Sequence, residues 1–359
     1  MPRSALITGS TGYIGVQVFS NLLRQKAIDR VLCISRHKDH EAFWSSIQSQ
    51  ANKFQVPLNL SEAKAKVGVV NVDLDKNHNL ILPALEKYKQ SVSTVHHLAC
   101  DSTYGHPFEH FEPWINCTKA LIEYCMDPKY PKQMYATGSY GHHLIDNPHV
   151  DHKEDFYFIN GYFQYKRWLN NYMQERMDEG LKGIVFEPAY IIGPVDPGQD
   201  YIFWRIARMF VTLGYAFKYP MGFTPVEMMI DNYMLTVNQP DTGLKVMSPI
   251  IPKPHPFFLY VHEAIQKLVP DLKIVDYQEF RNIIKQIMPK RLKYFGPNVP
   301  LVVETTNATA TFHPLYDNTR FEKGDLTDYL LNCAGLKEAV KLGLEDRQKL
   351  FTMRSQAAN

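Results

Sequence analysis

The sequence has few cysteines, almost no net charge and no long apolar run. Its five cysteines stand apart along 359 residues without a C-x-x-C pair, which is typical of small buried side chains in a reducing compartment. Lysine and arginine number 39 against 37 acidic residues, so no charge excess points to nucleic acid or an anionic membrane. The sequence has no run of about eighteen apolar residues that could span a membrane. Because the first strand and its glycines begin almost at once, we expect no signal peptide. We expect a cytoplasmic protein.

The first fifteen residues predict a nucleotide-binding turn. The apolar run Ala5–Ile7 is followed by glycines at Gly9, Gly12 and Gly15, and Val16–Arg24 has apolar residues at helical spacing. This order predicts a strand, a tight glycine turn and a helix whose N-terminus faces an anion. Three spaced glycines are weak evidence alone, but their position between a strand and a helix is the context that dinucleotide binding requires.

The first two thirds of the chain alternate apolar strands with helical patterns. This alternation predicts an α/β fold, a Rossmann doubly wound parallel sheet. The predicted strands are Ala5–Thr8, Val31–Ser35, Ala65–Asn71, Thr94–Leu98, Gln133–Thr137 and Gly183–Glu187. The predicted helices are Tyr13–Lys26, Phe43–Phe54, Leu82–Lys89, Glu112–Cys125 and Gly161–Glu179.

After Pro188 the pattern changes. We expect an NADP-binding Rossmann domain over residues 1–193 and a smaller, mostly helical substrate lobe over residues 194–359, with residues 226–248 returning to the sheet. The run Tyr201–Lys218 is helical in pattern and rich in aromatics. Its side chains either line an acyl channel or form the ordinary core of the lobe, and the second reading is preferred.

The second predicted strand indicates which nucleotide binds. NAD enzymes place an acidic residue at its end, which binds the adenosine ribose. Here Arg36 stands at that position, with Lys38 two residues later. A guanidinium can bind a 2′-phosphate, which a carboxylate would repel, so we expect NADPH. Arg36 as a plain solvated cation is the alternative. After the third strand, Asp73 and Leu74 could contact adenine, although a loop aspartate needs no such role.

A tyrosine and a lysine at helical spacing suggest proton-transfer chemistry. Tyr162 and Lys166 are four residues apart and therefore share a helix face. An ammonium close to the phenol favours the phenolate and would bring the tyrosine nearer its working range. Lysine can also hold the ribose of a nicotinamide nucleotide. Because Tyr165 is adjacent to Lys166, the alternative register stays open.

Further polar residues surround this pair in the predicted fold. Thr137, at the end of the preceding strand, could hydrogen-bond a substrate carbonyl beside Tyr162, with Ser139 as the alternative. Asn116, on the helix before that strand, could hold a backbone carbonyl or a water near Lys166, or could simply be satisfied locally.

Together these segments resemble an extended short-chain dehydrogenase/reductase. Within that superfamily the sequence is most similar to thioester reductase domains of nonribosomal peptide synthetases and carboxylic acid reductases, and to fatty acyl-CoA reductases. The matching segments are Thr8–Gly15, Cys33–Arg36, His97–Ala99, Asn116–Thr118, Thr137, Gly161–Trp168, Pro188–Gly193 and Thr224–Glu227.

The resemblance implies an NADPH-dependent oxidoreductase with Thr137, Tyr162 and Lys166 as its catalytic set. It also implies nucleotide contacts from residues of these segments, namely Thr8, Gly9, Thr11, Gly12, Tyr13, Ile14, Gly15, Leu98, Ala99, Pro188 and Ile191. Two residues depart from the family pattern. Glu187-Pro188-Ala189 replaces the usual Arg-Pro-Gly, and Tyr165 stands where a serine is common.

The leading prediction is hydride transfer to an acyl thioester, either acyl-CoA or carrier-bound, giving an aldehyde. Whether a second hydride then carries the aldehyde to an alcohol stays open. Since the chain begins at the first strand, we expect a free-standing enzyme. The first alternative is an extended reductase or epimerase acting on a nucleotide sugar or a small ketone or aldehyde. The second is a non-enzymatic NADP(H)-sensing protein, which the Tyr162–Lys166 pair disfavours.

Three histidine pairs stand out in the sequence: His96-His97, His106/His110 and His142-His143. No cysteine or carboxylate pattern accompanies them, and hydride chemistry needs no metal. We therefore expect no metal site, and we expect the segment around His106 to wall the nicotinamide pocket.

Overall fold

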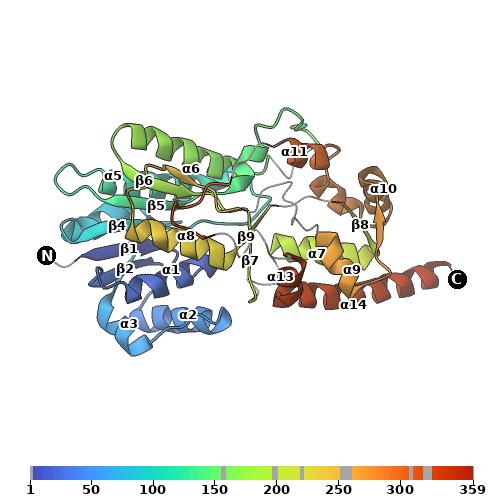
Figure 1. The fold of residues 1–359 in the computed structure, drawn as a ribbon, viewed down its shortest axis with the longest axis horizontal. Coiled ribbons are helices and arrows are strands. Elements are labelled where there is room, and N and C mark those ends of the chain that lie inside the picture. The colour runs from blue at the N-terminus through green and yellow to red at the C-terminus, as the bar shows by residue number, and fades with distance from the viewer. Residues whose placement is uncertain are drawn as a thin grey trace.

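The computed structural model describes residues 3–154, 159–195, 201–218, 222–250, 261–306, 310–317 and 326–358. Within these residues the chain forms a large parallel sheet covered by helices, with a smaller lobe beside it (Figure 1). The N-terminus lies at the sheet end of the molecule and the C-terminus at the far end of the lobe.

The main sheet has seven parallel strands in the order β10-β6-β5-β4-β1-β2-β3. Their bounds are β1 (Ser4–Thr8), β2 (Arg30–Ser35), β3 (Val67–Asn71), β4 (Val92–His97), β5 (Gln133–Thr137), β6 (Lys182–Phe186) and β10 (Val246–Met247). The strand order reverses between β1 and β4, and ligands of open α/β sheets bind outside the carboxyl ends of the strands at such a point. The predicted Rossmann fold is therefore confirmed.

Alternating side chains of the central strand explain why helices cover both faces. In β1, Leu6 belongs to the core shared with α4 (Ile81–Leu85), α5 (Glu112–Cys125) and α6 (Gly161–Asp178). Ala5 and Ile7 point to the other face and pack with α1 (Tyr13–Arg24), α2 (His40–Lys53) and α8 (Val226–Asn238). All three side chains are fully buried, as expected of a parallel sheet with two covered faces.

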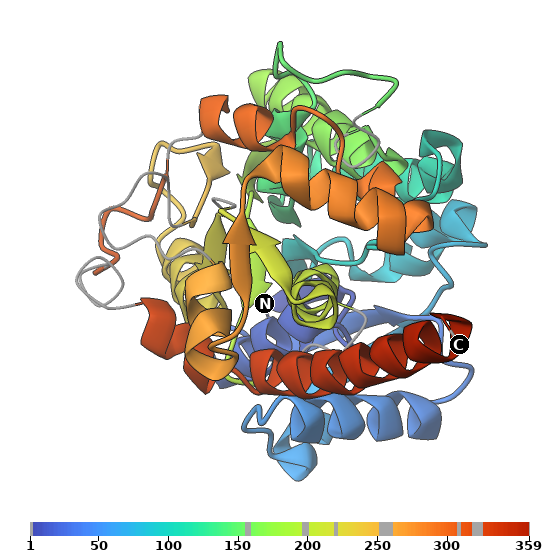
Figure 2. The ribbon, with the colours of Figure 1, turned by 90° about the vertical axis from the view of Figure 1, so that its right-hand side faces the viewer.

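The smaller lobe has its own apolar core. Its helices are α7 (Ile202–Leu213), α9 (Val261–Leu268), α10 (Tyr277–Ile287), α11 (Val299–Thr305), α13 (Leu326–Asn332) and α14 (Ala334–Ala358). In Figure 2, α14 and α10 run across the face that this lobe presents. Two short sheets complete it, β8 (Tyr215–Phe217) with β11 (Lys273–Val275) and β7 (Tyr190–Ile192) with β9 (Phe223–Pro225).

The aromatic run of α7 is core. Phe203, Trp204 and Phe210 are almost completely buried and pack among the apolar residues of the lobe. On the outer side, the Arg208 guanidinium donates to Asp346 of α14 at 2.8 Å. The described part of α7 thus supports the lobe-core interpretation of these residues over an acyl channel.

The predicted segments differ from the structure mainly at their ends. Residues 60–66 form a separate short helix, α3 (Leu60–Lys66), so the strand predicted from Ala65 begins at Val67. The helix predicted for Tyr201–Lys218 ends at Leu213, because Gly214 adopts a left-handed conformation (φ 75°). The chain then continues as β8.

Candidate active site

In the glycine turn after β1, the backbone segments around Gly9 and Gly15 pack too closely for side chains. Gly9 has a φ of +74°, in the left-handed region that favours glycine, and accepts a hydrogen bond from the Gly12 amide at 2.9 Å. A β-carbon on Gly15 would lie 1.8 Å from the Gly9 carbonyl oxygen. The first turn of α1 carries no acidic residue. This helix N-terminus, with its partial positive charge, fits the pyrophosphate of a dinucleotide.

Three other predicted contact residues lie where this turn enters α1. Thr11, Tyr13 and Ile14 are all half-buried. The Tyr13 ring packs on Phe54 at 4.8 Å between centroids, and its hydroxyl donates to the Val195 carbonyl at 3.5 Å. Tyr13 thereby joins the glycine turn to the chain that follows β7.

Thr8 ties β1 to the end of β4 through a buried polar network. Its hydroxyl oxygen accepts from the amides of Leu98 and Ala99 at 3.2 and 3.1 Å, so its proton is directed to His97 Nδ1 at 3.0 Å. His97 Nε2 then carries the ring proton and donates to Thr118 at 3.0 Å. Burial lowers the pKa of His97 to about 3, so the ring is neutral. The Thr8 hydroxyl is therefore engaged in holding Leu98 and Ala99 beside the glycine turn.

The adenosine end of the predicted site is formed by the carboxyl ends of β2 and β3. Arg36 and Lys38 are exposed and follow β2 directly. The Asn71 side-chain amide donates to the Lys38 carbonyl at 3.1 Å, which fixes this loop on β3. Asp73 accepts from the Asp75 amide at 3.3 Å, while Leu74 is buried in the sheet core. Arg36 and Lys38 therefore place two exposed cations directly after β2.

Lys166 is buried at the centre of the candidate site. Its side chain is 4 % exposed, and its ammonium donates to the Thr137 carbonyl at 2.7 Å and is hydrogen-bonded to the Cys100 thiol. The ammonium lies 5.6 Å from the ring centre of Tyr162 and 5.3 Å from that of Tyr165. Burial lowers the pKa of Lys166. The lysine thus connects the end of β5 with the aromatic face of α6.

Tyr162 and Tyr165 have different surroundings. Tyr162 shares a hydrogen bond with Ser139 and packs on Tyr104, at 5.1 Å between ring centres. Tyr165 is completely buried, stacks on Phe111 at 5.4 Å and has its hydroxyl 3.4 Å from that of Thr118. Only Tyr162 therefore lies against the polar loop that follows β5.

The ionisation of Tyr162 differs from the expectation. Burial, and then the neighbouring Tyr104 and Cys100, raise its pKa well above the ordinary value, while the Ser139 hydrogen bond opposes this shift. The expectation that Lys166 brings this phenol nearer to neutral pH is not met, because burial has the largest effect on the Tyr162 pKa and raises it. Tyr162 is a protonated phenol, which suits a proton donor.

Thr137 places a buried hydroxyl group at the carboxyl end of β5. Its Oγ1 atom is buried and makes no hydrogen bond among the described residues, although such a group normally finds one. It lies at the carboxyl end of β5, on the residue whose carbonyl holds Lys166. Ser139 accepts from the Gly141 amide at 3.2 Å as well as contacting Tyr162. Within the described residues, the Thr137 hydroxyl is therefore available to a further hydrogen-bond partner.

The other predicted residues lie nearby without joining this constellation. Asn116 is half-buried on α5, and within the described chain its side chain makes no hydrogen bond; Lys166 is held by Thr137 instead. The Pro188 carbonyl accepts from the Tyr140 amide at 2.9 Å, which joins the loops after β5 and β6. Ile191 is half-buried in β7.

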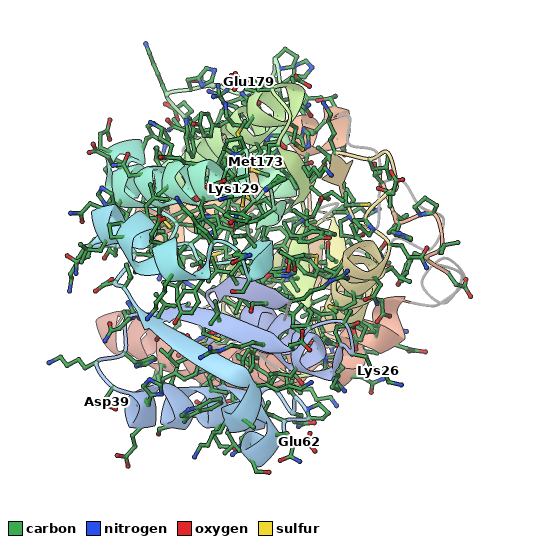
Figure 3. The ribbon with its side chains drawn as sticks, turned by 90° about the vertical axis from the view of Figure 1, so that its left-hand side faces the viewer. Lys26, Asp39, Glu62, Lys129, Met173 and Glu179 are labelled. Carbon is green, nitrogen blue, oxygen red and sulfur yellow. The ribbon has the colours of Figure 1, made fainter. Side chains whose placement is uncertain are left out.

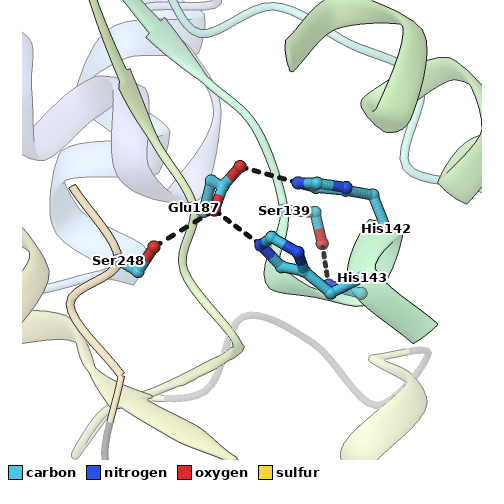
Figure 4. A network of polar contacts seen from close by, with 6 residues as sticks. Ser139, His142, His143, Glu187 and Ser248 are labelled. Carbon is cyan, nitrogen blue, oxygen red and sulfur yellow. Dashed lines mark hydrogen bonds and ion pairs between the residues drawn. The ribbon is translucent and has the colours of Figure 1, made fainter. Parts of the chain in front are cut away.

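A buried carboxylate supports the loop after β5 (Figure 4). Glu187 accepts from His142 at 2.6 Å, from His143 at 2.9 Å and from the Ser248 hydroxyl at 3.1 Å. These hydrogen bonds lower the pKa of the Glu187 carboxyl to about 2, against the opposing effect of burial. The network joins the chain after β6, the turn that begins at Ser139 and the strand β10. It occupies the position where the family pattern has arginine.

The network predicts a pH-dependent contribution to stability. A carboxyl whose pKa is lowered by folding stabilises the protein above its ordinary pKa of 4.5, and this contribution is lost as the pH falls toward about 2. We expect Glu187→Gln to lower the melting temperature most near neutral pH, by an amount equivalent to about 3 kcal/mol. The gap to the wild type should narrow steadily below about pH 4.5.

Thermal melts of both proteins from pH 7 to pH 3 measure this gap. Glu62→Gln, an exposed carboxylate of α3, is the control and should leave the curve almost unchanged. A gap of constant size across the range would contradict the assignment of a lowered pKa.

The prediction that no carboxylate accompanies the histidine pairs is wrong for two of the three pairs. The structure brings a carboxylate to two of the histidine pairs: Asp101 joins His106 and His110, and Glu187 joins His142 and His143. In each group the three donor atoms lie within 4.8 Å of one another. These carboxylates are distant in sequence or lie outside any helical spacing, so the sequence pattern did not reveal them.

Other contributors to the site were also missed. Tyr104 and Cys100 lie on the segment after β4 and face the Tyr162–Lys166 pair. Their neighbour His97 was predicted only as part of a histidine pair and of the family-matching segment His97–Ala99, without a role in this network. The one available signal was their place directly after a buried strand end, where sites of parallel sheets gather.

Comparison with known proteins identifies the family. The family model described as Male sterility protein matches residues 7–233, more than half of the chain. The chain belongs to this family. It is an NAD(P)-binding oxidoreductase of the extended short-chain dehydrogenase/reductase type, similar to thioester reductases.

Two curated relatives come from Aspergillus flavus. The aldehyde reductase lnaA is 22% identical over 344 residues, with 87% of this chain and 32% of the relative covered. The nonribosomal peptide synthetase asaC is 21% identical, with 96% and 35% covered. The chain therefore spans about a third of the length of these relatives.

Among solved structures, the terminal R domain from the myxalamid PKS-NRPS pathway superposes with a TM-score of 0.70 at 16% identity, covering 97% of this chain and 91% of that one. The reductase domain of a Mycobacterium tuberculosis nonribosomal peptide synthetase gives 0.61 at 15% identity, covering 95% and 92%. At these identities the structures establish the shared fold. None of the described helices combines the length and the apolar character that a membrane span requires.

Proposed function

We propose that this protein is an NADPH-dependent reductase that converts an acyl thioester, acyl-CoA or carrier-bound, to an aldehyde, with or without a second reduction to an alcohol. The observation that carries the proposal is the meeting of three groups at the end of β5. Thr137 has a buried hydroxyl that makes no hydrogen bond to any described residue, its carbonyl fixes Lys166, and Tyr162 is a protonated phenol beside Ser139.

The roles of these residues follow from their ionisation and hydrogen bonds. When bound, the reduced nicotinamide supplies hydride to the thioester carbonyl carbon. Thr137 and Tyr162 donate hydrogen bonds to the oxygen as negative charge develops on it, and Tyr162 then transfers its proton to give a hemithioacetal. The Lys166 ammonium stabilises the phenolate that remains. Collapse of the hemithioacetal expels the thiol and leaves the aldehyde.

The nucleotide would lie along the carboxyl ends of the strands. The Gly9–Gly15 turn would hold the pyrophosphate, and Arg36 with Lys38 would hold the 2′-phosphate of NADPH. Leu98, Ala99 and Asn116 would line the nicotinamide half, with Pro188 and Ile191 on the opposite wall. Residues 194–359 would supply the substrate lobe.

Arg36 is testable as the residue that selects NADPH. Arg36→Ala should raise the Kd for NADPH at least about tenfold, because a charge-assisted hydrogen bond contributes about 1.5–3 kcal/mol. The Kd for NADH should be unchanged. Fluorescence titration of both nucleotides measures the two constants.

Lys26→Ala is the matched control, since it removes one exposed cation from the same domain. Lys26 lies well away from Asp39, the helix cap three residues after Arg36 (Figure 3). This variant should bind NADPH as the wild type does. Equal losses for both nucleotides in Arg36→Ala would contradict a 2′-phosphate contact.

The substrate class is tested by a panel of acyl-CoA thioesters, carrier-bound thioesters, ketones and nucleotide sugars. NADPH oxidation is followed optically, and the products are identified by mass spectrometry. Thioester-dependent oxidation with release of free thiol supports the proposal. Turnover of ketones or nucleotide sugars alone would instead support the alternative reductase or epimerase.

A further inference from the structure

One face of the segment after β4 carries two histidines and an aspartate whose side chains converge. The Asp101 carboxylate accepts from His110 Nε2 at 2.7 Å, and the His106 and His110 rings are nearly parallel with centres 3.9 Å apart. One donor atom from each of the three residues lies within 4.8 Å of the other two.

Asp101 is held in place for this contact. Its second oxygen, Oδ1, accepts from the Thr103 amide at 2.8 Å, which leaves Oδ2 directed at His110. The side chains of His110 and Asp101 are 36% and 26% exposed, so an ion can reach them from solvent. Hydrogen bonds to the outer oxygen of a ligating carboxylate are a common feature of metal sites.

We propose that Asp101, His106 and His110 bind a divalent transition metal ion of the zinc type. A set of two imidazoles and one carboxylate favours Zn²⁺, whereas Mg²⁺ and Ca²⁺ prefer oxygen ligands alone. Bond lengths of about 2.0–2.2 Å place the ligand atoms of a tetrahedral ion about 3.3 Å apart. The three side chains therefore need to close by only about 1.5 Å, which exposed rotamers permit. The ion takes the place of the proton that His110 Nε2 donates to Asp101. This proton moves to His110 Nδ1, so the imidazole stays neutral while Nε2 binds the ion.

The site lies on the wall beside Tyr162. The Gly161 amide donates to the His106 carbonyl at 3.0 Å, and a β-carbon on Gly161 would lie 2.4 Å from Pro107. Tyr104, between Asp101 and His106, packs on the Tyr162 ring. An ion at this site connects Asp101 to the helical turn η3 (Phe108–Phe111). It would therefore hold in place the segment after β4 that packs beside Tyr162. This consequence depends on the geometry alone and not on the proposed substrate.

Binding is tested with Co²⁺ added to the purified full chain, whose visible absorption reports nitrogen and oxygen ligation. One Co²⁺ per chain should bind and be displaced by Zn²⁺. His110→Ala and His106→Ala should each weaken binding more than about tenfold, while His40→Ala and His149→Ala, which remove exposed histidines elsewhere, should not. Melting temperatures of the metal-free variants check that each one is folded.

Hydrogen exchange gives a second readout. Zn²⁺ should slow exchange over residues 101–111 in the wild type and have no effect in His110→Ala. Binding that survives in both His106→Ala and His110→Ala but is lost in His143→Ala would move the ion to the Glu187 cluster and overturn the proposal. Absence of saturable Co²⁺ absorption in the wild type would overturn it as well.

Discussion

Replacing Tyr162 by phenylalanine is expected to lower kcat by about 10²–10⁴-fold. The substitution removes one oxygen atom, which shares a hydrogen bond with Ser139 and carries the proton destined for the substrate oxygen. The Tyr104 ring contact remains available to phenylalanine, so folding and the Kd for NADPH should change little. Steady-state kinetics with a responsive thioester, together with nucleotide titration, separate the two effects.

Tyr165→Phe is the matched control on the same helix. Its hydroxyl lies 3.4 Å from that of Thr118 and its ring is buried against Phe111, away from the Ser139 loop. We expect kcat to stay within about threefold of the wild type, because a hydrogen bond of this length contributes little. A large loss in Tyr165→Phe with normal turnover by Tyr162→Phe would reverse the register of the catalytic pair.

Gly15→Ala is expected to destabilise the protein by about 3 kcal/mol and to abolish nucleotide binding. The added β-carbon would lie 1.8 Å from the Gly9 carbonyl oxygen and 2.7 Å from its carbon. Both atoms belong to the backbone, so no rotamer relieves the clash and α1 must move away from the turn. Thermal melts and NADPH titration measure the two losses.

Gly222→Ala tests whether any added methyl group has this effect. Among the described residues, a β-carbon there would meet the Ala189 side chain at 3.4 Å and that of Tyr140 at 3.9 Å, and nothing closer. The melting temperature should stay near that of the wild type. A stable, NADPH-binding Gly15→Ala protein would mean that the turn does not hold the pyrophosphate.

The sheet could be predicted from the sequence mainly because β1 and β2 are almost completely buried and contain apolar runs. The glycine turn, α5 and the start of α6 were also found, since local signals mark each of them. Asn160, for example, caps α6 by accepting from the Phe163 amide at 3.0 Å. These features depend on neighbours in the chain, and a single sequence contains that information.

The features that were missed depend on contacts between distant residues. The three-residue strands β7, β8, β9 and β11 exist only through their pairing, and so short a segment has no period of its own. The Glu187 network joins residues 142, 187 and 248. Likewise, the raised pKa of Tyr162 reflects burial first and then the neighbouring Tyr104, Cys100 and Tyr201. The spacing between Tyr162 and Lys166 does not reveal these surroundings.

Hydride transfer to a thioester carbonyl is measured most directly by following an isotope from the nucleotide to the product. NADPH carrying deuterium at both C4 positions of the nicotinamide is incubated with the enzyme and an acyl thioester, and the product is analysed by mass spectrometry. Hydride transfer to the thioester carbonyl predicts one deuterium at C1 of the aldehyde, or two at C1 of the alcohol, with almost no labelled product from Tyr162→Phe. Thioester cleavage without deuterium at C1, or labelled product formed equally well by Tyr162→Phe, would contradict it.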